Sequence, residues 1–595
     1  MAMAIVMATV GAARAEGEAA AAEAGGAEAG AYLAARAAGA AHDYAEASGL
    51  FARALAGDPA DPWLLENALA AELAMGRLDA ALVHADRLVE AGVASQPAHL
   101  VRAAAHAGLG DWRALLADLE AGRGAGPLID GLSRAWARLG LGETEAALSA
   151  FDEVAQARGM RAFGLYHKAL AMASIGDLAG AEAILALPES EGMQRTRRGV
   201  LAQAQVLSGL GRDDDAVAAI DAAFGRDLDA ATASLRARLA AGEAVPFTQA
   251  ETPLEGLAEV YFTVAAALTG EEDAETALAY ARVALALDPM HADAALLAAA
   301  RLEDLGQPAL ATMAYALVAE SDPAFVAAET GRASVLRRQG EGEAAAEVLA
   351  GLARGHPDLP EVQAALGDQL RALDRLEEAE AAYDRAIGLY VEGDGGQADG
   401  SLWFAHYRRA LARQARGDWT GAEADLRRAL DLRPGQPAVL NHLGYSLVDR
   451  GEDLEEALGL IEEAVRLQPQ NGAIVDSLGW ALYRLGRFEA AARELERAAT
   501  LEPTDAVVND HLGDALWAVG RTREARFQWR RALSFEPEAE TVERIRRKLD
   551  EGLDAVLAAE GAGAGASLVS DVPADEPPAD VTPAEGAGAA GEQDG

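Results

Sequence analysis

The sequence predicts an all-α fold in the form of a solenoid, a long stack of antiparallel helix pairs. Its 595 residues exceed what one compact core usually holds, so several domains or one extended array is expected. Hydrophobic residues make up 51% of the chain but aromatic residues only 5%, and alanine is the largest contributor to the apolar count. Because alanine favours helix and lets helices approach closely, this composition indicates many thin helices packed on one another.

Prolines recur along the chain at a nearly constant interval. The first series has a spacing of 34 residues, and the second has spacings of 35, 34 and 34. The two series come into register if residues 392–400 (EGDGGQADG), which have a loop composition, are an insert. The prolines are Pro289, Pro323 and Pro357, then Pro434, Pro469, Pro503 and Pro537.

Small and bulky residues recur in step with the prolines. A small residue marks the expected crossing point of the first helix of each pair, and a bulky residue follows in the second helix. We expect the small residues to let the two helices pack closely and the bulky residues to fill the wedge between neighbouring repeats. The small residues are Gly367, Ala410, Gly444, Gly479 and Gly513, and the bulky residues are Tyr383, Leu426, Ile461, Leu495 and Trp529.

Each pair is punctuated in a way that suits two helices. A glycine such as Gly486 or Gly520 ends the first helix, since glycine adopts a left-handed conformation cheaply, and the proline ends the second. Helix pairs with a period of 34 residues are the tetratricopeptide pattern. The sequence therefore predicts a right-handed superhelix of about 13–14 tetratricopeptide repeats.

The repeats and the composition divide the chain into seven segments. The repeats of the first half are degenerate, with spacings that drift from about 30 to 36 residues, and the phase breaks near 228–252. A charged helix after Pro537 suits the polar cap that a solenoid needs. The predicted segments are a signal peptide (1–15), a disordered linker (16–30), a degenerate N-terminal array (31–246), a central array (253–391), the loop insert (392–400), a C-terminal array with its capping helix (401–556) and a disordered acidic tail rich in Ala, Gly and Pro (557–595).

Charge and composition exclude several classes of function. The net charge of −44 argues against a nucleic-acid partner, which would need clustered Lys and Arg. The chain has no cysteine, so it has no disulfide, thiolate metal site or cysteine nucleophile. None of the common catalytic motifs is present, and the ten histidines show no metal-ligand spacing. We therefore expect no enzyme activity, no cofactor, no metal and no transmembrane segment.

A binding function should lie on the concave face, which the first helix of each pair lines. Aromatic residues are scarce in this chain, yet they collect on this face of the last repeats, and Tyr, Trp and Arg dominate binding energy at interfaces. The alternative is that Trp480, Trp517 and Tyr445 pack between repeats. The candidate residues are Phe404, Tyr407, Gln414, Asn441, Tyr445, Asp449, Asp476, Trp480, Tyr483, Arg484, Asp510, Asp514 and Trp517.

The stretch 437–530 carries more specific motifs. It reads LGYxLxD from Leu443, DSxGWxxYRxG from Asp476 and HLGxxLWxxG from His511. These motifs resemble the C-terminal repeats of bacterial envelope tetratricopeptide proteins of the LbcA type. That resemblance implies an adaptor that binds a periplasmic carboxyl-terminal processing protease and presents substrates to it. This chain departs from the family in lacking a lipid-anchor cysteine, so membrane attachment is not carried over.

The start of the chain bears on localisation. An apolar run from Ala2 to Ala12 leads to Ala13-Arg14-Ala15, an A-x-A pattern that predicts cleavage and a soluble periplasmic protein. Since no Lys or Arg precedes the run, a cytoplasmic location is the alternative. An assembly factor for an envelope machine, such as a pilus or an outer-membrane complex, is the alternative function. The sequence leaves the oligomeric state open.

Overall fold

The computed structural model describes residues 30–225, 228–268, 270, 273–393 and 401–561. Within these ranges the chain is helical and contains no strand. It forms two compact units, residues 1–348 and 349–595, which are described separately below. The predicted signal peptide, nearly all of the predicted linker and loop insert, and most of the predicted tail lie outside the described residues.

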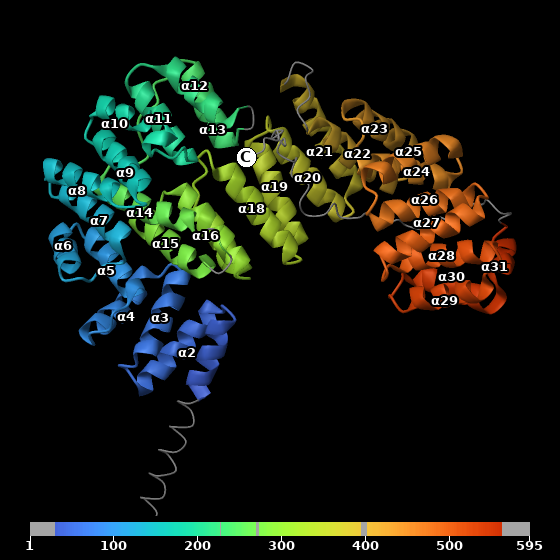
Figure 1. Cartoon of the computed structure of the whole chain (residues 1–595), viewed down its shortest axis with the longest axis horizontal. Coiled ribbons are helices and arrows are strands. Elements are labelled where there is room, and N and C mark those ends of the chain that lie inside the picture. Colours follow the sequence, from blue (N-terminus) through green and yellow to red (C-terminus); the bar gives the residue numbers. More distant parts are fainter. Residues whose placement is uncertain (1–29, 226–227, 269, 271–272, 394–400, 562–595) are drawn as a thin grey trace, which may run out of the picture. The chain divides into compact units, whose positions relative to one another are not determined.

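The first unit is a succession of short helices that pair with their neighbours along the chain (Figure 1). Residues 30–40 are helical and precede α2. The helices are α2 (Tyr44–Gly57), α3 (Pro62–Ala74), α4 (Leu78–Glu90), α5 (Gln96–Gly108), α6 (Trp112–Glu120), α7 (Pro127–Gly140), α8 (Thr144–Gln156), α9 (Arg161–Ser174), α10 (Leu178–Leu185), the 3₁₀ turn η1 (Glu189–Glu191), α11 (Arg197–Gly209), α12 (Asp213–Phe224), α13 (Ala230–Ala240), α14 (Pro253–Ala267), α15 (Ala274–Leu287), α16 (Ala292–Asp304), α17 (Pro308–Tyr315) and α18 (Phe325–Arg338), with α19 (Gly342–Gly355) crossing into the second unit.

The second unit continues the same pattern of helix pairs. Here α24, α26 and α28 contact one another in succession and form an inner row, and each pairs with the helix that follows it. The helices are α20 (Pro360–Ala372), α21 (Leu376–Gly393), α22 (Leu402–Ala415), α23 (Trp419–Leu432), α24 (Pro437–Arg450), α25 (Leu454–Leu467), α26 (Gly472–Arg484), α27 (Phe488–Leu501), α28 (Ala506–Ala518), α29 (Thr522–Leu533), α30 (Ala539–Glu551) and α31 (Leu553–Ala559).

The helix ends lie where the sequence places them. Gly486 and Gly520 have φ angles of 73° and 80° and end α26 and α28 in the left-handed conformation that glycine tolerates best. Pro469 and Pro503 follow the last residues of α25 and α27, since proline cannot continue a helix. The predicted capping helix differs, because Gly552 (φ 87°) breaks it into α30 and α31.

The recurring small and bulky residues form the crossing point inside each helix pair. A Cβ atom on Gly479 would collide with Leu495, and a Cβ on Gly513 would collide with Trp529. Trp529 is fully buried at this crossing. The bulky residue therefore packs onto the small residue of its own repeat, and not only between neighbouring repeats as the sequence suggested.

The compact units divide the chain at 348/349, which differs from the boundary predicted between 246 and 253. Residues 243–252 contain no helix, as the break in phase suggested. However, α14 and α15, on the far side of this segment, pack against helices of the N-terminal array. The predicted N-terminal array thus shares one unit with residues 253–348 of the predicted central array, whereas residues 349–391 of that array belong to the second unit.

Candidate functional site

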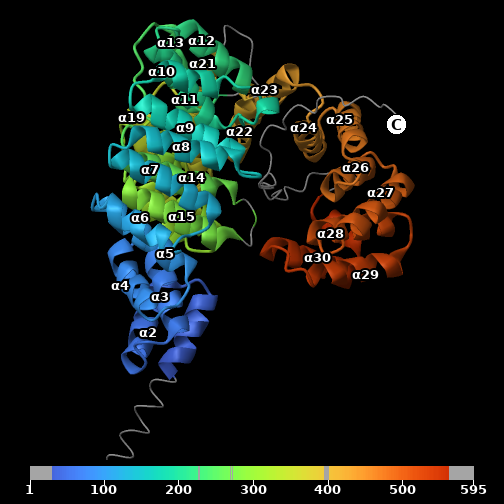
Figure 2. The same cartoon turned by 60° about the vertical axis from the view of Figure 1, so that its left-hand side comes forward.

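The inner row of the first unit is covered by helices of the same chain. In this unit α3 contacts α5, and α7 contacts α9, as the inner helices of successive pairs do. Helix α14 packs on α7 and α9, and α15 packs on α3 and α5; Figures 1 and 2 both place α14 beside α7 and α9. A partner chain could not occupy this stretch of the inner row without displacing α14 and α15.

Specific contacts hold α15 on this surface. Gln96 Nε2 of α5 donates to the hydroxyl of Tyr280 at 3.1 Å. Arg282 is only 7% exposed, and its Nε donates at 3.0 Å to the carbonyl of Ala74, the last residue of α3. A cation is favourable there because the carbonyls at a helix C-terminus carry partial negative charge.

A buried charged group holds α14. Glu259 is fully buried, and its carboxylate accepts a hydrogen bond from Tyr166 of α9 at 2.7 Å. It also pairs with Arg198 of α11 at 2.7 Å and lies 3.1 Å from His291 Nε2. Burial alone would raise the pKa of Glu259, but Arg198 and His291 outweigh it and lower the pKa to about 2. Glu259 is therefore ionised at neutral pH and joins α14 to α9 and α11.

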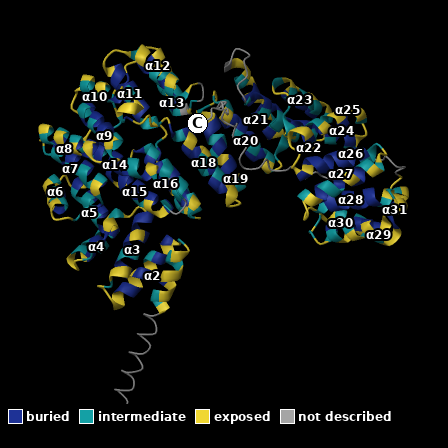
Figure 3. Cartoon of the chain, viewed as in Figure 1, coloured by how far each residue is buried: buried dark blue, intermediate teal, exposed yellow. Residues whose placement is uncertain are grey.

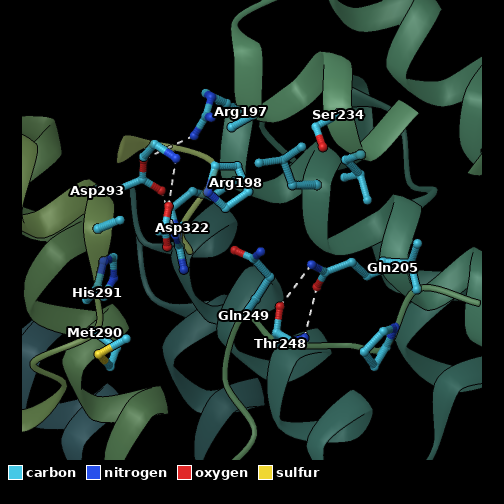
Figure 4. A pocket seen from close by; sticks show the side chains of 18 of the residues that line it. Arg197, Arg198, Gln205, Ser234, Thr248, Gln249, Met290, His291, Asp293 and Asp322 are labelled. Carbon is cyan, nitrogen blue, oxygen red and sulfur yellow. Dashed lines mark hydrogen bonds and ion pairs between the residues drawn. The ribbon is translucent and has the colours of Figure 1, made fainter. Parts of the chain in front are cut away.

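A cavity of about 350 Å³ lies beside this group (Figure 4). Its wall includes part of the non-helical segment 243–252, which is bound to α11 by Gln205. Gln205 Oε1 accepts from the amide of Thr248, and its Nε2 donates to the Thr248 hydroxyl, both at 3.0 Å. Arg197 and Arg198, also in the wall, both pair with Asp293. The charges of these two arginines are therefore paired within the chain.

The inner row of the second unit carries the predicted aromatic residues. Tyr445 lies on α24, Trp480 and Tyr483 lie on α26, and His511 lies on α28. The Trp480 ring stacks on Tyr483 with centroids 5.0 Å apart and on His511 with centroids 4.2 Å apart. Tyr445 and Tyr483 are half-buried. The structure thus brings the predicted residues of α26 together into a stack that runs on to α28.

Four of the predicted residues are buried within the array and are not the exposed groove residues that the sequence suggested. They lie on α26 and α28, where Figure 3 shows buried stretches in dark blue. They are Asp476, Trp480, Asp510 and Asp514, which are 5%, 6%, 6% and 1% exposed. Each carboxylate has a partner on another helix, because a buried charge is costly unless it is paired. The remaining predicted residues are half-buried, namely Phe404, Tyr407, Gln414, Asn441, Tyr445, Asp449, Tyr483, Arg484 and Trp517.

Lys548 is the partner of two of these carboxylates. It is 0% exposed, and its Nζ lies 2.7 Å from Asp510 and 2.8 Å from Asp514. Asp514 also accepts a hydrogen bond from Trp529 Nε1 at 2.9 Å. Burial raises the pKa of Asp514, and Lys548 opposes that rise. This cluster joins α28 to the capping helix α30 and has a structural role.

His511 pairs with the third buried carboxylate. Its Nδ1 lies 2.9 Å from Asp476 Oδ2. Burial lowers the pKa of His511, but the charge of Asp476 outweighs it and the net pKa is raised. Trp517 has internal contacts too, since its Nε1 donates to Asp554 of α31 at 3.1 Å. This contact favours the packing alternative for Trp517.

His442 of α24 is packed against α22: its Nε2 lies 2.9 Å from Gln414 Oε1, and burial lowers its pKa to about 4. Sequence reasoning missed Lys548 and the covering of the first inner row. Lys548 lies in the highly charged stretch 543–551, where the neighbouring arginines are at least partly exposed. The sequence therefore gives no sign that this one cation is buried. Long-range packing of this kind leaves little trace in a local pattern.

The described residues contain no group of three His, Cys, Asp or Glu side chains placed to hold a metal ion. Among the helices described here, none is both long and apolar enough to cross a bilayer.

Comparison with known proteins identifies the repeats. Residues 330–394, 407–472 and 444–506 match the model of the tetratricopeptide repeat family. A curated relative, the TPR repeat-containing protein PA4667 of Pseudomonas aeruginosa, is 33% identical over 173 residues. That alignment covers 29% of this chain and 28% of the relative, so it spans less than a third of either protein.

Solved structures show more distant likenesses. A chain of the APC/C hetero-tetramer Cut9-Hcn1 matches over 88% of this chain and 96% of its own length, with 15% identity and a TM-score of 0.35. The pilF protein of Pseudomonas aeruginosa matches over 35% of this chain and 90% of its own, with 21% identity and a TM-score of 0.28. At these TM-scores neither structure carries an argument about function. The repeats within residues 330–506 are therefore tetratricopeptide repeats, and they belong to a chain whose described residues form all-α helix pairs.

Proposed function

We propose that this protein is a non-catalytic scaffold that binds a protein partner through the inner row of its second unit, centred on Tyr445 and Tyr483. The observation that carries the proposal is the difference between the two inner rows. In the first unit α14 and α15 lie on the inner helices, whereas the helices that pack against α24 and α26 are their neighbours in the array. Half-buried tyrosines on a helix row that no distant helix among the described residues of this unit covers are the kind of side chain that anchors protein interfaces.

Charged residues beside the tyrosines would set the register of the partner. Asp449 and Arg484 are half-buried on the same row, and an Arg484 Nη atom lies 3.5 Å from the carbonyl of Asp449. Burial raises the pKa of Asp449, and Arg484 opposes that rise. Partly desolvated charges of this kind select among partners more than they add affinity.

The finer proposal is that the scaffold acts in the bacterial envelope and delivers substrates to a carboxyl-terminal processing protease. It is supported by the LbcA-type motifs at Leu443, Asp476 and His511 and by the apolar run with its A-x-A pattern at the start of the sequence. N-terminal sequencing of the native protein tests the export step: a chain beginning at Glu16 is expected, and an intact Met1 in the cytosol contradicts it.

Co-purification of the full chain with the protease tests the binding surface. Tyr445→Ala and Tyr483→Ala should each weaken binding by about 2 kcal/mol, roughly thirtyfold. Arg493→Ala, an exposed change on the outer helix α27, is the matched control and should bind normally.

Melting measured on the same variants separates binding from packing. The proposal predicts lost binding in variants whose melting temperature changes little. If Tyr483→Ala unfolds early, or if both tyrosine variants retain full affinity, the inner row is not the binding surface. Capture of pilus or outer-membrane subunits instead of a protease would support the assembly-factor alternative.

A further inference from the structure

The outer face of α29 is basic and carries an exposed aromatic ring, although the chain as a whole has a net charge of −44. Phe527 is 60% exposed at the middle of this helix. Residues 523, 526, 527, 530 and 531 are spaced so that they share one face of a helix. Four of the five are arginines. We call these five residues the α29 face: Arg523, Arg526, Phe527, Arg530 and Arg531.

None of these four arginines forms an ion pair with a carboxylate among the described residues, although many other arginines of the array do so. Arg521, one residue before α29, pairs with both Glu496 and Glu524. In contrast, Arg526 donates to the carbonyl of Leu549, and Arg531 lies over the ring of Phe535 at 5.8 Å. An exposed phenyl ring among guanidinium groups that have no carboxylate partner among the described residues is a surface that suits an acidic segment with an apolar anchor.

The chain itself contains a segment of that chemistry. Residues 562–595 include seven acidic residues and no Lys or Arg. An apolar pair, Leu568 and Val569, precedes the acidic part. The acidic residues are Asp571, Asp575, Glu576, Asp580, Glu585, Glu592 and Asp594.

This segment begins close to the α29 face. Arg526 bonds to Leu549 near the end of α30 and lies 5.6 Å from the ring of Trp517, which in turn bonds to Asp554 of α31. Leu568 follows Gly561, the last described residue, by seven positions, so an extended chain would reach about 23 Å. Helix α29, with 12 residues, is only about 18 Å long. The apolar pair is therefore within reach of Phe527.

We propose that residues 562–595 dock on the α29 face of the same molecule, with Leu568 and Val569 against Phe527 and the acidic residues against the arginines. Tethering favours this occupant over a separate acidic protein. A segment joined to its site by a few residues has an effective concentration in the millimolar range, whereas a free acidic partner is repelled by the overall charge of the chain. The docked segment would cover the last repeat and keep other acidic chains from the α29 face.

A single label on the full chain tests the proposal. Because the sequence has no cysteine, Ser570→Cys accepts one fluorophore, whose anisotropy reports whether the segment is held. Reversing two charges, Arg523→Glu with Arg530→Glu, should lower the anisotropy at least twofold, and so should Phe527→Ser. Arg493→Glu, the same charge change on the exposed face of α27, is the control and should leave it unchanged. Salt at 1 M should act like the charge reversal, because it screens exposed charges.

A compensating change completes the test. Asp571→Arg with Asp575→Arg should restore the anisotropy in the charge-reversed chain. Circular dichroism would show that each variant is folded. The proposal is overturned if the α29 variants leave the anisotropy unchanged, or if the Arg493 control lowers it equally. A separate acidic peptide should bind the α29 face more weakly in the unaltered full chain than in a chain without residues 562–595. Equal affinity of the peptide for the two chains also overturns the proposal.

Discussion

Replacing Lys548 by methionine tests whether the buried charged cluster holds the end of the second unit. In the native chain, Lys548 Nζ lies within 2.8 Å of both Asp510 and Asp514, and none of the three side chains is more than 9% exposed. Methionine keeps most of the side-chain volume but removes the cation. Two carboxylates would then remain buried without a positive partner at hydrogen-bonding distance.

The expected cost follows from that arrangement. Removing one member of a buried ion pair typically lowers the free energy of unfolding by about 3–5 kcal/mol, because the other charge stays buried and unpaired. Arg544, 3.9 Å from each carboxylate, would compensate only partly. A triple variant with Lys548→Met, Asp510→Asn and Asp514→Asn has no buried charge in the cluster and should recover to within about 2 kcal/mol of the native protein.

Urea unfolding of the full chain, with hydrogen exchange to localise the change to α28–α30, is the assay. Protonating Asp514 should relieve the single variant. Burial raises the pKa of Asp514 and Lys548 opposes that rise, so without the lysine this pKa should rise further and the deficit should be smaller at pH 5 than at pH 8. The reasoning is refuted if Lys548→Met costs under 1 kcal/mol at pH 7, or if the triple variant is no more stable than the single one.

Three further changes test the packing of each unit. Gly479→Leu would force a side chain into Leu495 and should cost roughly 1–3 kcal/mol in the second unit alone; equal destabilisation of the first unit would contradict nearest-neighbour packing. Glu259→Gln should lower the free energy of unfolding of the first unit by about 3–5 kcal/mol, with the exposed Glu251→Gln as control, and increased hydrogen exchange in α14 would locate the effect. The pKa of His442 is lowered to about 4, so the stabilising contribution of the neutral side chain is present above pH 6.5 and is lost as the pH falls toward 4. His442→Gln should remove about 3 kcal/mol of this pH dependence of the free energy of unfolding. Identical pH profiles of the denaturation midpoint in the native protein and the variant would refute the assignment.

Because α14 and α15 cover the first inner row, the inner face is not available to a partner along the whole chain. A regular solenoid would offer its inner face along the whole chain. Here Glu259, Tyr280 and Arg282 attach α14 and α15 to helices more than 90 residues earlier in the sequence. This explains why we place partner binding in the second unit and not along the full length of the repeats.

The aromatic candidates show where sequence reasoning reaches its limit. Periodicity placed Tyr445, Trp480 and Tyr483 on the first helix of each pair, and in the structure they lie on α24 and α26, which contact each other. It did not separate the half-buried tyrosines from the buried Trp480, because one helix turn decides whether a ring faces the groove or the next repeat. Their role in binding stays a prediction.

The sequence by itself determined the fold class, the pairing of helices and their ends. Those features depend on local physics: glycine permits the turn at Gly486, proline ends the helix before Pro503, and a missing side chain at Gly479 admits Leu495. Only the tertiary structure decided that α14 and α15 cover the first inner row, and that Lys548 is the counter-ion of Asp510 and Asp514. These contacts join residues far apart in the chain, and whether a charged side chain is buried depends on what packs over it, which no repeat period encodes.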